Sequence, residues 1–131
     1  MTVLLLDASV VLSAFDTEDD LHHAARALLA DDSVSLATLD LARYEVANVA
    51  VRSWRKPRAA PRLLEAIEQL GQDGGVVASN QSLLARAAEL AEEHEISVYD
   101  ATYVAAVDTG DRSLVSCDRR DLVSKGLAAL P

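Results

Sequence analysis

The sequence predicts an α/β fold in which helices cover both faces of a central parallel sheet. Short apolar runs typical of buried strands are separated by stretches whose apolar residues recur at helical spacing. Strands that are separated by helices usually pair in parallel, and the helices then pack on the faces of the sheet. The chain of 131 residues is long enough for one such core, and we expect a single domain over residues 1–131.

The first part of the sequence predicts two strands and two helices. Apolar residues form strands at 2–6 and 34–37, and a helix follows the first strand from Asp7 to Phe15. A second helix is indicated by the i, i+3, i+4, i+7, i+8 spacing of Leu21, Ala24, Ala25, Leu28 and Leu29.

The middle of the chain predicts a long helix followed by a shorter one. Thr38 is placed to cap a helix that runs to about Arg55. Pro57 ends this helix, because the residue before a proline avoids the α conformation. The elements that follow are a helix from about Leu63 that closes near Gly71, a turn at Gly74-Gly75 and a minimal strand at Val76-Val77.

The last part of the chain predicts three helices and a strand. The helix over 81–94 carries its apolar residues on one face. It is followed by a helix from Asp100 to Val107 that stops at Gly110, a strand at 113–116, a short helix from Asp118 to about Lys125, and a weak edge strand at the C-terminus.

Four carboxylates stand at the ends or on the inner faces of these elements: Asp7, Glu45, Asp100 and Asp118. Asp7 and Asp118 each follow a predicted strand directly, and sites in such sheets lie at the carboxyl ends of the strands. A cluster of acids is unfavourable unless a cation neutralises it. The sequence therefore predicts a metal site at this edge of the sheet, and metal with carboxylates suggests phosphodiester chemistry.

Helix capping is the alternative explanation for three of these acids. Aspartate is a good N-cap, so Asp7, Asp100 and Asp118 could each only cap the helix that follows. Capping does not explain Glu45, which lies well inside its predicted helix on the face of apolar neighbours. Glutamate is almost never fully buried unless it is paired. Arg52 is two turns away from Glu45 and is not placed to pair with it. The position of Glu45 therefore favours a metal pocket over helix capping.

The types of residue around the acids indicate which ion fits. Oxygen ligands suit Mg²⁺, with Mn²⁺ as a further possibility, whereas His22, His23 and His94 show no zinc spacing and are expected at the surface. Ser9, Asn48 and Ser116 could orient an acid or a metal-bound water, or could only satisfy neighbouring polar groups. The single cysteine, Cys117, is expected to be a packed thiol in a reducing cytoplasm.

The charge of the chain limits what it can bind. A net charge of −9 argues against general nucleic-acid binding, although bound divalent cations would offset part of it. Five cations nevertheless fall within one stretch: Arg52, Arg55, Lys56, Arg58 and Arg62. This stretch is either a solvated helix end and turn or an edge that contacts phosphates.

No apolar run approaches the ~20 residues that span a bilayer, and no signal-peptide pattern is present, so we expect a cytoplasmic protein. Aromatic residues make up 4% of the chain and offer few platforms for base stacking, so the shape of any bound nucleic acid would matter more.

Four sequence segments together resemble a PIN domain. They are Leu4-Leu5-Leu6-Asp7-Ala8-Ser9, Tyr44-Glu45-Val46-Ala47-Asn48-Val49, Tyr99-Asp100-Ala101-Thr102-Tyr103-Val104-Ala105 and Leu114-Val115-Ser116-Cys117-Asp118. Each segment alone is a weak signal, whereas four in this order and spacing are fairly specific. The short chain is similar to the VapC toxins of type II toxin–antitoxin pairs.

The resemblance implies a PIN-like three-layer α/β/α sandwich and a Mg²⁺- or Mn²⁺-dependent ribonuclease. Asp7 and Asp100 match the principal metal ligands, and Glu45 and Asp118 complete the acidic quartet. The family also implies a homodimer and a cognate antitoxin that blocks the site. Ser116 stands where the family more often has threonine. Asp121 could be an extra acid near the site, but a solvent-facing helix residue is the favoured interpretation.

Two other classes of function remain open at the level of sequence. A phosphate-handling enzyme or signalling receiver shares the architecture, but position 9 is serine where a haloacid-dehalogenase-like phosphatase needs aspartate, and the acid pair of a receiver is missing. A non-catalytic interaction module, whose acids only cap helices, would bind no divalent metal.

Overall fold

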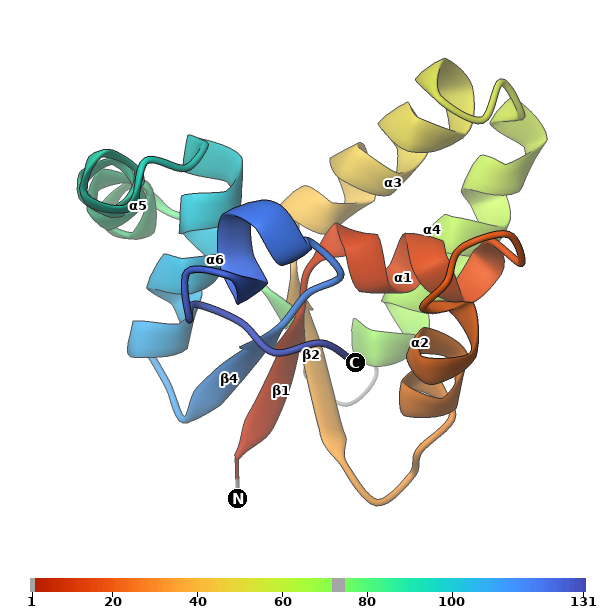
Figure 1. Cartoon of the computed structure of the whole chain (residues 1–131), viewed down its shortest axis with the longest axis horizontal. Helices are drawn as coiled ribbons and strands as arrows, with labels where there is room; N and C mark the ends of the chain where they lie inside the picture. Colours follow the sequence, from red (N-terminus) through yellow and green to blue (C-terminus); the bar gives the residue numbers. More distant parts are fainter. Residues whose placement is uncertain (1, 72–74) are drawn as a thin grey trace.

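Four parallel strands form the central sheet of the computed structural model, which describes residues 2–71 and 75–131. They are β1 (Val3–Leu6), β2 (Ser35–Leu39), β3 (Val76–Val77) and β4 (Arg112–Val115), in the spatial order β3-β2-β1-β4 (Figure 1). Leu5 of β1 pairs with Ala37 on one side and with Leu114 on the other. The chain moves from β1 towards β3 in one direction and later returns to β4 on the other side, so the strand order switches beside β1. The carboxyl ends of β1 and β4 are where this class of fold places its site.

Helices cover both faces of the sheet. They are α1 (Ala8–Phe15), α2 (His22–Leu29), α3 (Leu41–Arg52), α4 (Ala60–Gly71), α5 (Gln81–His94) and α6 (Val98–Asp108). Leu5 and Leu114 pack on one face with α5 and α6, and Leu6 and Val115 pack on the other with α1 and α2. Neighbouring residues of a strand point to opposite faces, which is why one apolar run serves both layers. The predicted α/β/α sandwich with a parallel sheet is confirmed.

The helices α3 and α4 extend the second layer beyond the sheet. They pack against each other and against α1 through a buried cluster of their own. Figure 1 shows that α3 rises away from the carboxyl edge of the strands and that α4 returns beside it, with α5 and α6 on the opposite side. None of the helices within 2–71 and 75–131 is long and apolar enough to cross a membrane.

The prediction that Thr38 caps the third helix is wrong. Thr38 lies inside β2 and is fully buried, and its hydroxyl donates to the Leu6 carbonyl at 2.7 Å. The strand thus continues to Leu39, two residues further than predicted, and α3 starts at Leu41. A threonine after an apolar run is equally compatible with a cap and with a buried strand position, and the bond to β1 decides between them.

The prediction that α3 reaches Arg55 is also wrong. The helix ends at Arg52, and Pro57 instead begins a short 3₁₀ helix, Pro57–Ala59. Arg55 adopts a left-handed backbone with φ of 56°, and the Lys56 amide donates back to the Ala50 carbonyl at 2.8 Å. The turn is therefore made before the proline and not by it.

The second half of the chain follows the predicted order with shifted boundaries. The bounds of β3 and α5 agree with the prediction, while Gly74 of the predicted turn lies outside the described residues. α6 starts two residues earlier than predicted, with Ser97 as its N-cap. A one-turn π-helix, Arg119–Val123, replaces the longer helix expected after Asp118. The expected C-terminal edge strand is a single parallel bridge between Val115 and Ala129.

Candidate active site

Asp7 lies at the carboxyl end of β1, as predicted, and is only 5% exposed. It is the N-cap of α1, since its side chain accepts a hydrogen bond from the Ser9 amide at 3.1 Å. The Ser9 hydroxyl donates to the same oxygen, Oδ1, and the Ser116 hydroxyl donates to Oδ2 at 2.5 Å. Capping and a role in the site are thus compatible, because the cap fixes the orientation of the carboxylate.

The two serines also fix the end of β4 against the end of β1. The Ser9 hydroxyl oxygen accepts from the Cys117 amide, and the Ser116 hydroxyl oxygen accepts from the Asp118 amide, both at 2.9 Å. Ser116 is fully buried. Each hydroxyl therefore donates to Asp7 and accepts from the segment that carries Asp118, so the expectation that serines orient an acid is confirmed for Asp7.

Glu45 projects from α3 towards the site and hydrogen-bonds a buried tyrosine. The Tyr103 hydroxyl donates to Glu45 Oε1 at 2.7 Å, and Tyr103 is 1% exposed. Burial, followed by the charge of Glu45, raises the pKa of Tyr103 far above its usual value, so the phenol stays protonated and acts as a donor. Sequence reasoning missed this residue, although its position one turn after Asp100 on the same helix was a signal.

Asp100 and Asp118 approach each other at the edge of the sheet, and a third acid joins them. The carboxylate oxygens of Asp100, Asp118 and Asp121 lie within 4.8 Å of one another. Asp118 caps the π-helix by accepting from the Asp121 amide at 2.9 Å. Asp100 is not a cap, and its backbone amide donates to the hydroxyl oxygen of the N-cap Ser97 at 3.0 Å. The expectation that Asp121 only faces solvent is wrong, because the π-helix turns it back towards Asp118.

Electrostatic coupling connects Asp7 and Glu45 to this group through Asp100. Burial, and then the charges of Asp100 and Glu45, raise the pKa of Asp7 to about 6 against the hydrogen bonds of its two serines. The pKa of Glu45 is raised by burial and by Asp100, and the pKa of Asp100 by burial and then by Asp118 and Asp121. The acids thus disfavour one another's charged forms, which a cation would reverse.

Side-chain cations of the described residues leave the charges of the four predicted acids without a partner. Within the described part of the chain, none of Asp7, Glu45, Asp100 and Asp118 forms an ion pair with lysine, arginine or histidine. Arg120 comes within 3.8 Å of Asp121, but its side chain is 93% exposed, and such surface pairs contribute little. An all-oxygen set of carboxylates without a counter-charge fits a hard divalent cation such as Mg²⁺ or Mn²⁺.

The remaining residues that the sequence singled out lie outside this group. Asn48 is exposed and makes no side-chain hydrogen bond to a described residue. His22 is buried, contrary to expectation, with Nδ1 2.9 Å from the Ser13 carbonyl oxygen. Burial and the charge of Asp7 raise the pKa of the half-buried Cys117 to about 11, so this thiol is protonated at neutral pH.

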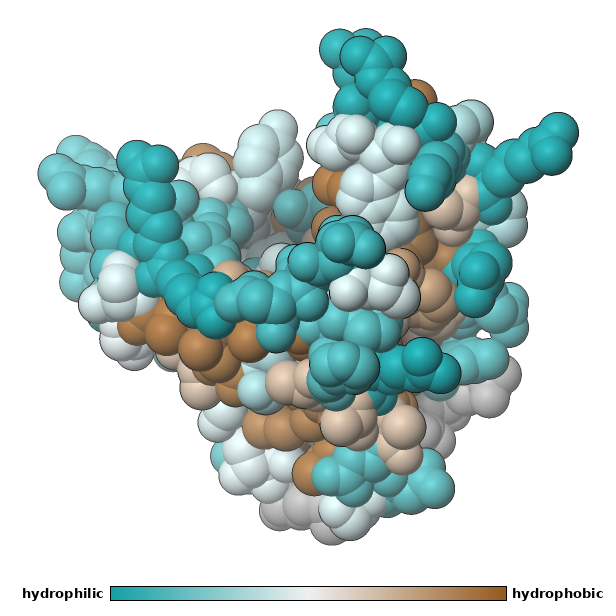
Figure 2. All heavy atoms as spheres, turned by 45° about the vertical axis from the view of Figure 1, so that its right-hand side comes forward, coloured by the Kyte–Doolittle hydropathy of each residue, from teal (hydrophilic) through white to brown (hydrophobic). Residues whose placement is uncertain are grey.

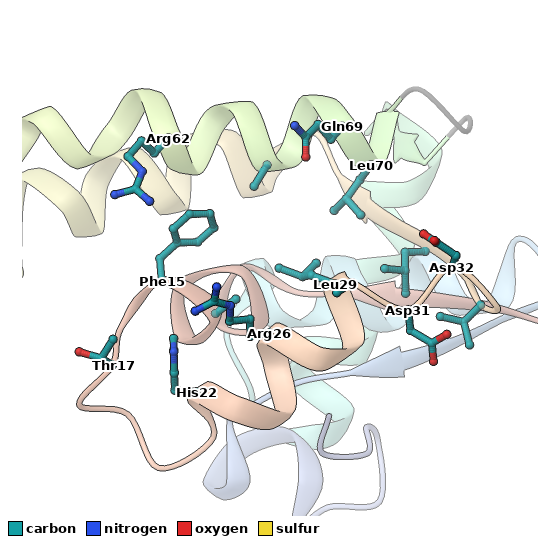
Figure 3. Close-up of a pocket in the computed structure, with 15 residues that line it drawn as sticks. Phe15, Thr17, His22, Arg26, Leu29, Asp31, Asp32, Arg62, Gln69 and Leu70 are labelled. Atoms are coloured by element: carbon teal, nitrogen blue, oxygen red, sulfur yellow. The ribbon is translucent and has the colours of Figure 1, made fainter.

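A separate cavity of about 640 Å³ opens between α2 and α4, away from the acids. Figure 3 shows Phe15 and Leu29 on its apolar floor, with Arg26 and Arg62 at one end and Asp31 and Asp32 at the other. None of the clustered carboxylates lines this cavity, so the cavity is not the candidate active site despite its size.

A parallel sheet whose carboxyl edge gathers acids from separate elements is the arrangement of a metal-dependent nuclease of the PIN class. The family model for the PIN domain matches residues 4–125, and the chain therefore belongs to the PIN domain family.

A curated relative gives a more particular likeness. The chain is 34% identical over 121 residues to ribonuclease VapC3 of Pyrobaculum aerophilum, covering 89% of this chain and 90% of the relative. It is thus a homologue of the VapC ribonucleases.

Solved structures show the same fold at lower identity. VapC20 of Mycobacterium tuberculosis, described as a toxin that cleaves the sarcin–ricin loop, is 19% identical, with a TM-score of 0.65 over 88% of this chain and 87% of that chain. A toxin–antitoxin complex from Klebsiella pneumoniae is 16% identical, with a TM-score of 0.64 over 90% of this chain and 88% of that chain.

Proposed function

We propose that this chain is the toxin of a type II toxin–antitoxin pair and an endoribonuclease that hydrolyses RNA with Mg²⁺ or Mn²⁺. The observation that carries the proposal is the group of carboxylates at the carboxyl edge of the sheet, in which Asp7, Glu45, Asp100 and Asp118 form no ion pair with a cation of the described residues. Such a group is unfavourable in its charged form unless a cation offsets it, and the donor set suits a hard divalent ion.

We assign the ion to Asp7, Glu45, Asp100 and Asp118, with Asp121 as a fifth acid beside them. When bound, the ion would lower the pKa of a water molecule and would stabilise negative charge on the phosphate oxygens. The protein holds the acids in place: Ser9 and Ser116 orient Asp7, and the Tyr103 hydroxyl orients Glu45.

RNA as substrate is supported by the homology to VapC3, a ribonuclease, and by the absence of the features that other phosphate chemistries need. The Ser9 hydroxyl, at the position where a phosphatase of the haloacid-dehalogenase type carries an aspartate, is committed to Asp7 and to the Cys117 amide. A signalling receiver needs a pair of acids at the end of the first strand, where this chain has Asp7 alone.

The proposed partners are a cognate antitoxin and a second copy of this chain. An inhibitor with arginine side chains suits the acid cluster, because guanidinium pairs bidentately with carboxylates. Exposed apolar side chains on α3, α5 and the start of α6 support a homodimer: Tyr44, Val51, Leu84, Val98 and Tyr99.

Total RNA incubated with the purified protein and Mg²⁺ or Mn²⁺ tests the proposed activity. New RNA ends mapped by sequencing are expected with the wild type and are expected to vanish with Asp7→Asn, whose fold is checked by circular dichroism. Equal cleavage by both proteins would exclude this site. Calorimetry that shows no binding of either cation would instead favour an interaction module.

A further inference from the structure

Four cations form an exposed patch at the corner between α3 and α4, which we call the basic corner: Arg52, Arg55, Lys56 and Arg58. All four are exposed, and none makes an ion pair or a side-chain hydrogen bond with any residue in 2–71 or 75–131. Arg62, the fifth cation of this stretch, differs because its guanidinium lies over the Phe15 ring at 5.6 Å.

Helix α3 leads from the acid cluster to the basic corner. Glu45 and Arg52 are seven residues apart, so their side chains leave the helix within about 20° of each other. The rise between them is about 10 Å. Arg52 therefore stands on the same stripe of α3 as Glu45, two turns further from the sheet. Figure 2 shows the surface hollowed between the projecting α3–α4 side and the α5–α6 side, with hydrophilic side chains over much of the rim.

The backbone of the corner is held in one conformation. Arg55 has φ of 56° although it is not glycine, a conformation that costs energy and persists only when its surroundings impose it. The Lys56 amide donates to Ala50, and Trp54 packs on the buried cluster that joins α1, α3 and α4. The cations are therefore presented outward by an ordered turn.

An anionic strand needs such a patch to reach this site. The chain carries a net charge of −9, and the acids of the site repel RNA until cations offset them. Arginine pairs bidentately with phosphate, and each contact releases counterions from the RNA. Most of the other arginines of the described chain already pair with carboxylates or carbonyls, among them Arg43, Arg86, Arg112 and Arg119.

We propose that the basic corner binds the phosphates of the RNA strand that flanks the scissile bond, with Arg52 nearest the site. This inference rests on the proposed ribonuclease function and assigns the corner to substrate binding rather than to chemistry. Of the two interpretations of the cations in residues 52–62, it selects the edge that contacts phosphates over the solvated helix end. An acidic segment of a protein inhibitor is the competing occupant.

Two charge-matched triple variants test the inference. The corner variant replaces Arg52→Gln, Arg55→Gln and Arg58→Gln, and the control replaces Arg26→Gln, Arg43→Gln and Arg86→Gln. Both lose three positive charges, all at exposed positions except the half-buried Arg43 of the control, so an effect of net charge alone is the same in both. Thermal unfolding of each variant confirms that the fold is kept.

Cleavage is measured on a long RNA and on a minimal RNA with only two nucleotides on either side of the same bond. The corner variant is expected to raise KM for the long RNA at least 10-fold with kcat unchanged, and to leave the minimal RNA unaffected. The slope of log KM against log salt is expected to fall by about 2, since each single-strand contact contributes about 0.7. Equal effects of the two variants, or no effect of the corner variant, would overturn the inference.

Binding separates the failure of this inference from the failure of the proposed activity. In Asp7→Asn protein, labelled long RNA is expected to bind at least 10-fold more weakly when the corner is also replaced, whether or not the wild type cleaves RNA. Unchanged RNA binding together with weaker inhibition by the antitoxin would assign the corner to that protein and contradict the assignment to RNA.

Discussion

At the scale of single residues, Tyr103 links two helices that carry acids of the site. It stands one turn after Asp100 on α6 and donates to Glu45 on α3, so one buried hydroxyl connects Glu45 to the helix that carries Asp100. Partners of this kind orient ligands, and their loss typically costs 10- to 100-fold in metal affinity or activity.

Tyr103→Phe tests this role, because it removes the hydroxyl and keeps the ring in the core. We expect Mn²⁺ affinity, measured by calorimetry, to fall about 10-fold or more, and RNA cleavage at subsaturating metal to fall with it. Excess metal should restore much of the rate. The matched control, Tyr99→Phe, removes an exposed hydroxyl at the start of the same helix and is expected to leave affinity unchanged. Equal affinities of all three proteins would show that the hydrogen bond is not needed.

Asp7 gives the metal-free protein a distinctive dependence of stability on pH. Its pKa is raised from 3.8 to about 6, chiefly because burial disfavours the charged form. The folded protein thus holds this proton more tightly than the unfolded chain does. The resulting stabilisation is fully present below pH 3.8 and is lost as the pH rises through about 6. A pKa raised by about 2 corresponds to at most about 3 kcal/mol of the free energy of unfolding.

Asp7→Asn carries no charge at any pH and should escape this loss. In the presence of a chelator, we expect the variant to exceed the wild type in free energy of unfolding at pH 7.5 and to lose that advantage near pH 4. Urea denaturation at the two pH values measures the difference. An Asp7→Asn protein that is less stable than the wild type at pH 7.5 would contradict the assignment of an unfavourable buried charge.

At the scale of elements, the cap of α6 connects local helix stability to the site. Ser97 accepts the amide of Asp100, and Asn80 caps α5, which carries none of the clustered acids, in the same way through the Leu83 amide. Ser97→Ala and Asn80→Ala should each cost about 1 kcal/mol of stability.

Only Ser97→Ala is expected to weaken Mn²⁺ binding, because the first turn of α6 holds Asp100. Urea denaturation and calorimetry on the same two variants check both halves of this statement. The same loss of metal affinity in Asn80→Ala would mean that general destabilisation, and not the position of Asp100, explains the effect.

Sequence patterns predicted elements better than they predicted element ends. The strands and α5 were predicted from the spacing of their apolar residues, because the buried face of a strand or a helix repeats with a fixed period. Thr38, Asp100 and Pro57 were misassigned, since each residue type has two common positions and only tertiary contacts choose between them. Asp121 was considered as an extra acid near the site but was assigned to solvent, because the π-turn that brings it back has no local sequence signature. Tyr103 was missed although it lies one turn after Asp100, because its bond to Glu45 joins two different helices.

At the scale of the whole molecule, the site is assembled from segments that are distant in sequence. Asp7 comes from the end of β1, Glu45 from α3, Asp100 from α6 and Asp118 from beyond β4. The order of the strands made it predictable that Asp7 and Asp118 lie at the same edge of the sheet, because the carboxyl ends of neighbouring parallel strands share one edge. The burial of Glu45 and the position of Asp100 depend on how the helices pack. The sequence indicates which face of each helix is apolar, but it does not indicate how the helices pack against one another.

The most direct test of a divalent-metal site that cleaves RNA is the rate of cleavage of one defined RNA during titration of Mn²⁺ into metal-stripped protein. The account predicts no cleavage without metal, a rate that saturates with Mn²⁺ in the wild type, and a rate lower by about 10²-fold or more in Asp100→Asn, since the site loses a charged ligand. A wild-type rate that is the same with and without metal, or an Asp100→Asn protein as active as the wild type, would contradict it.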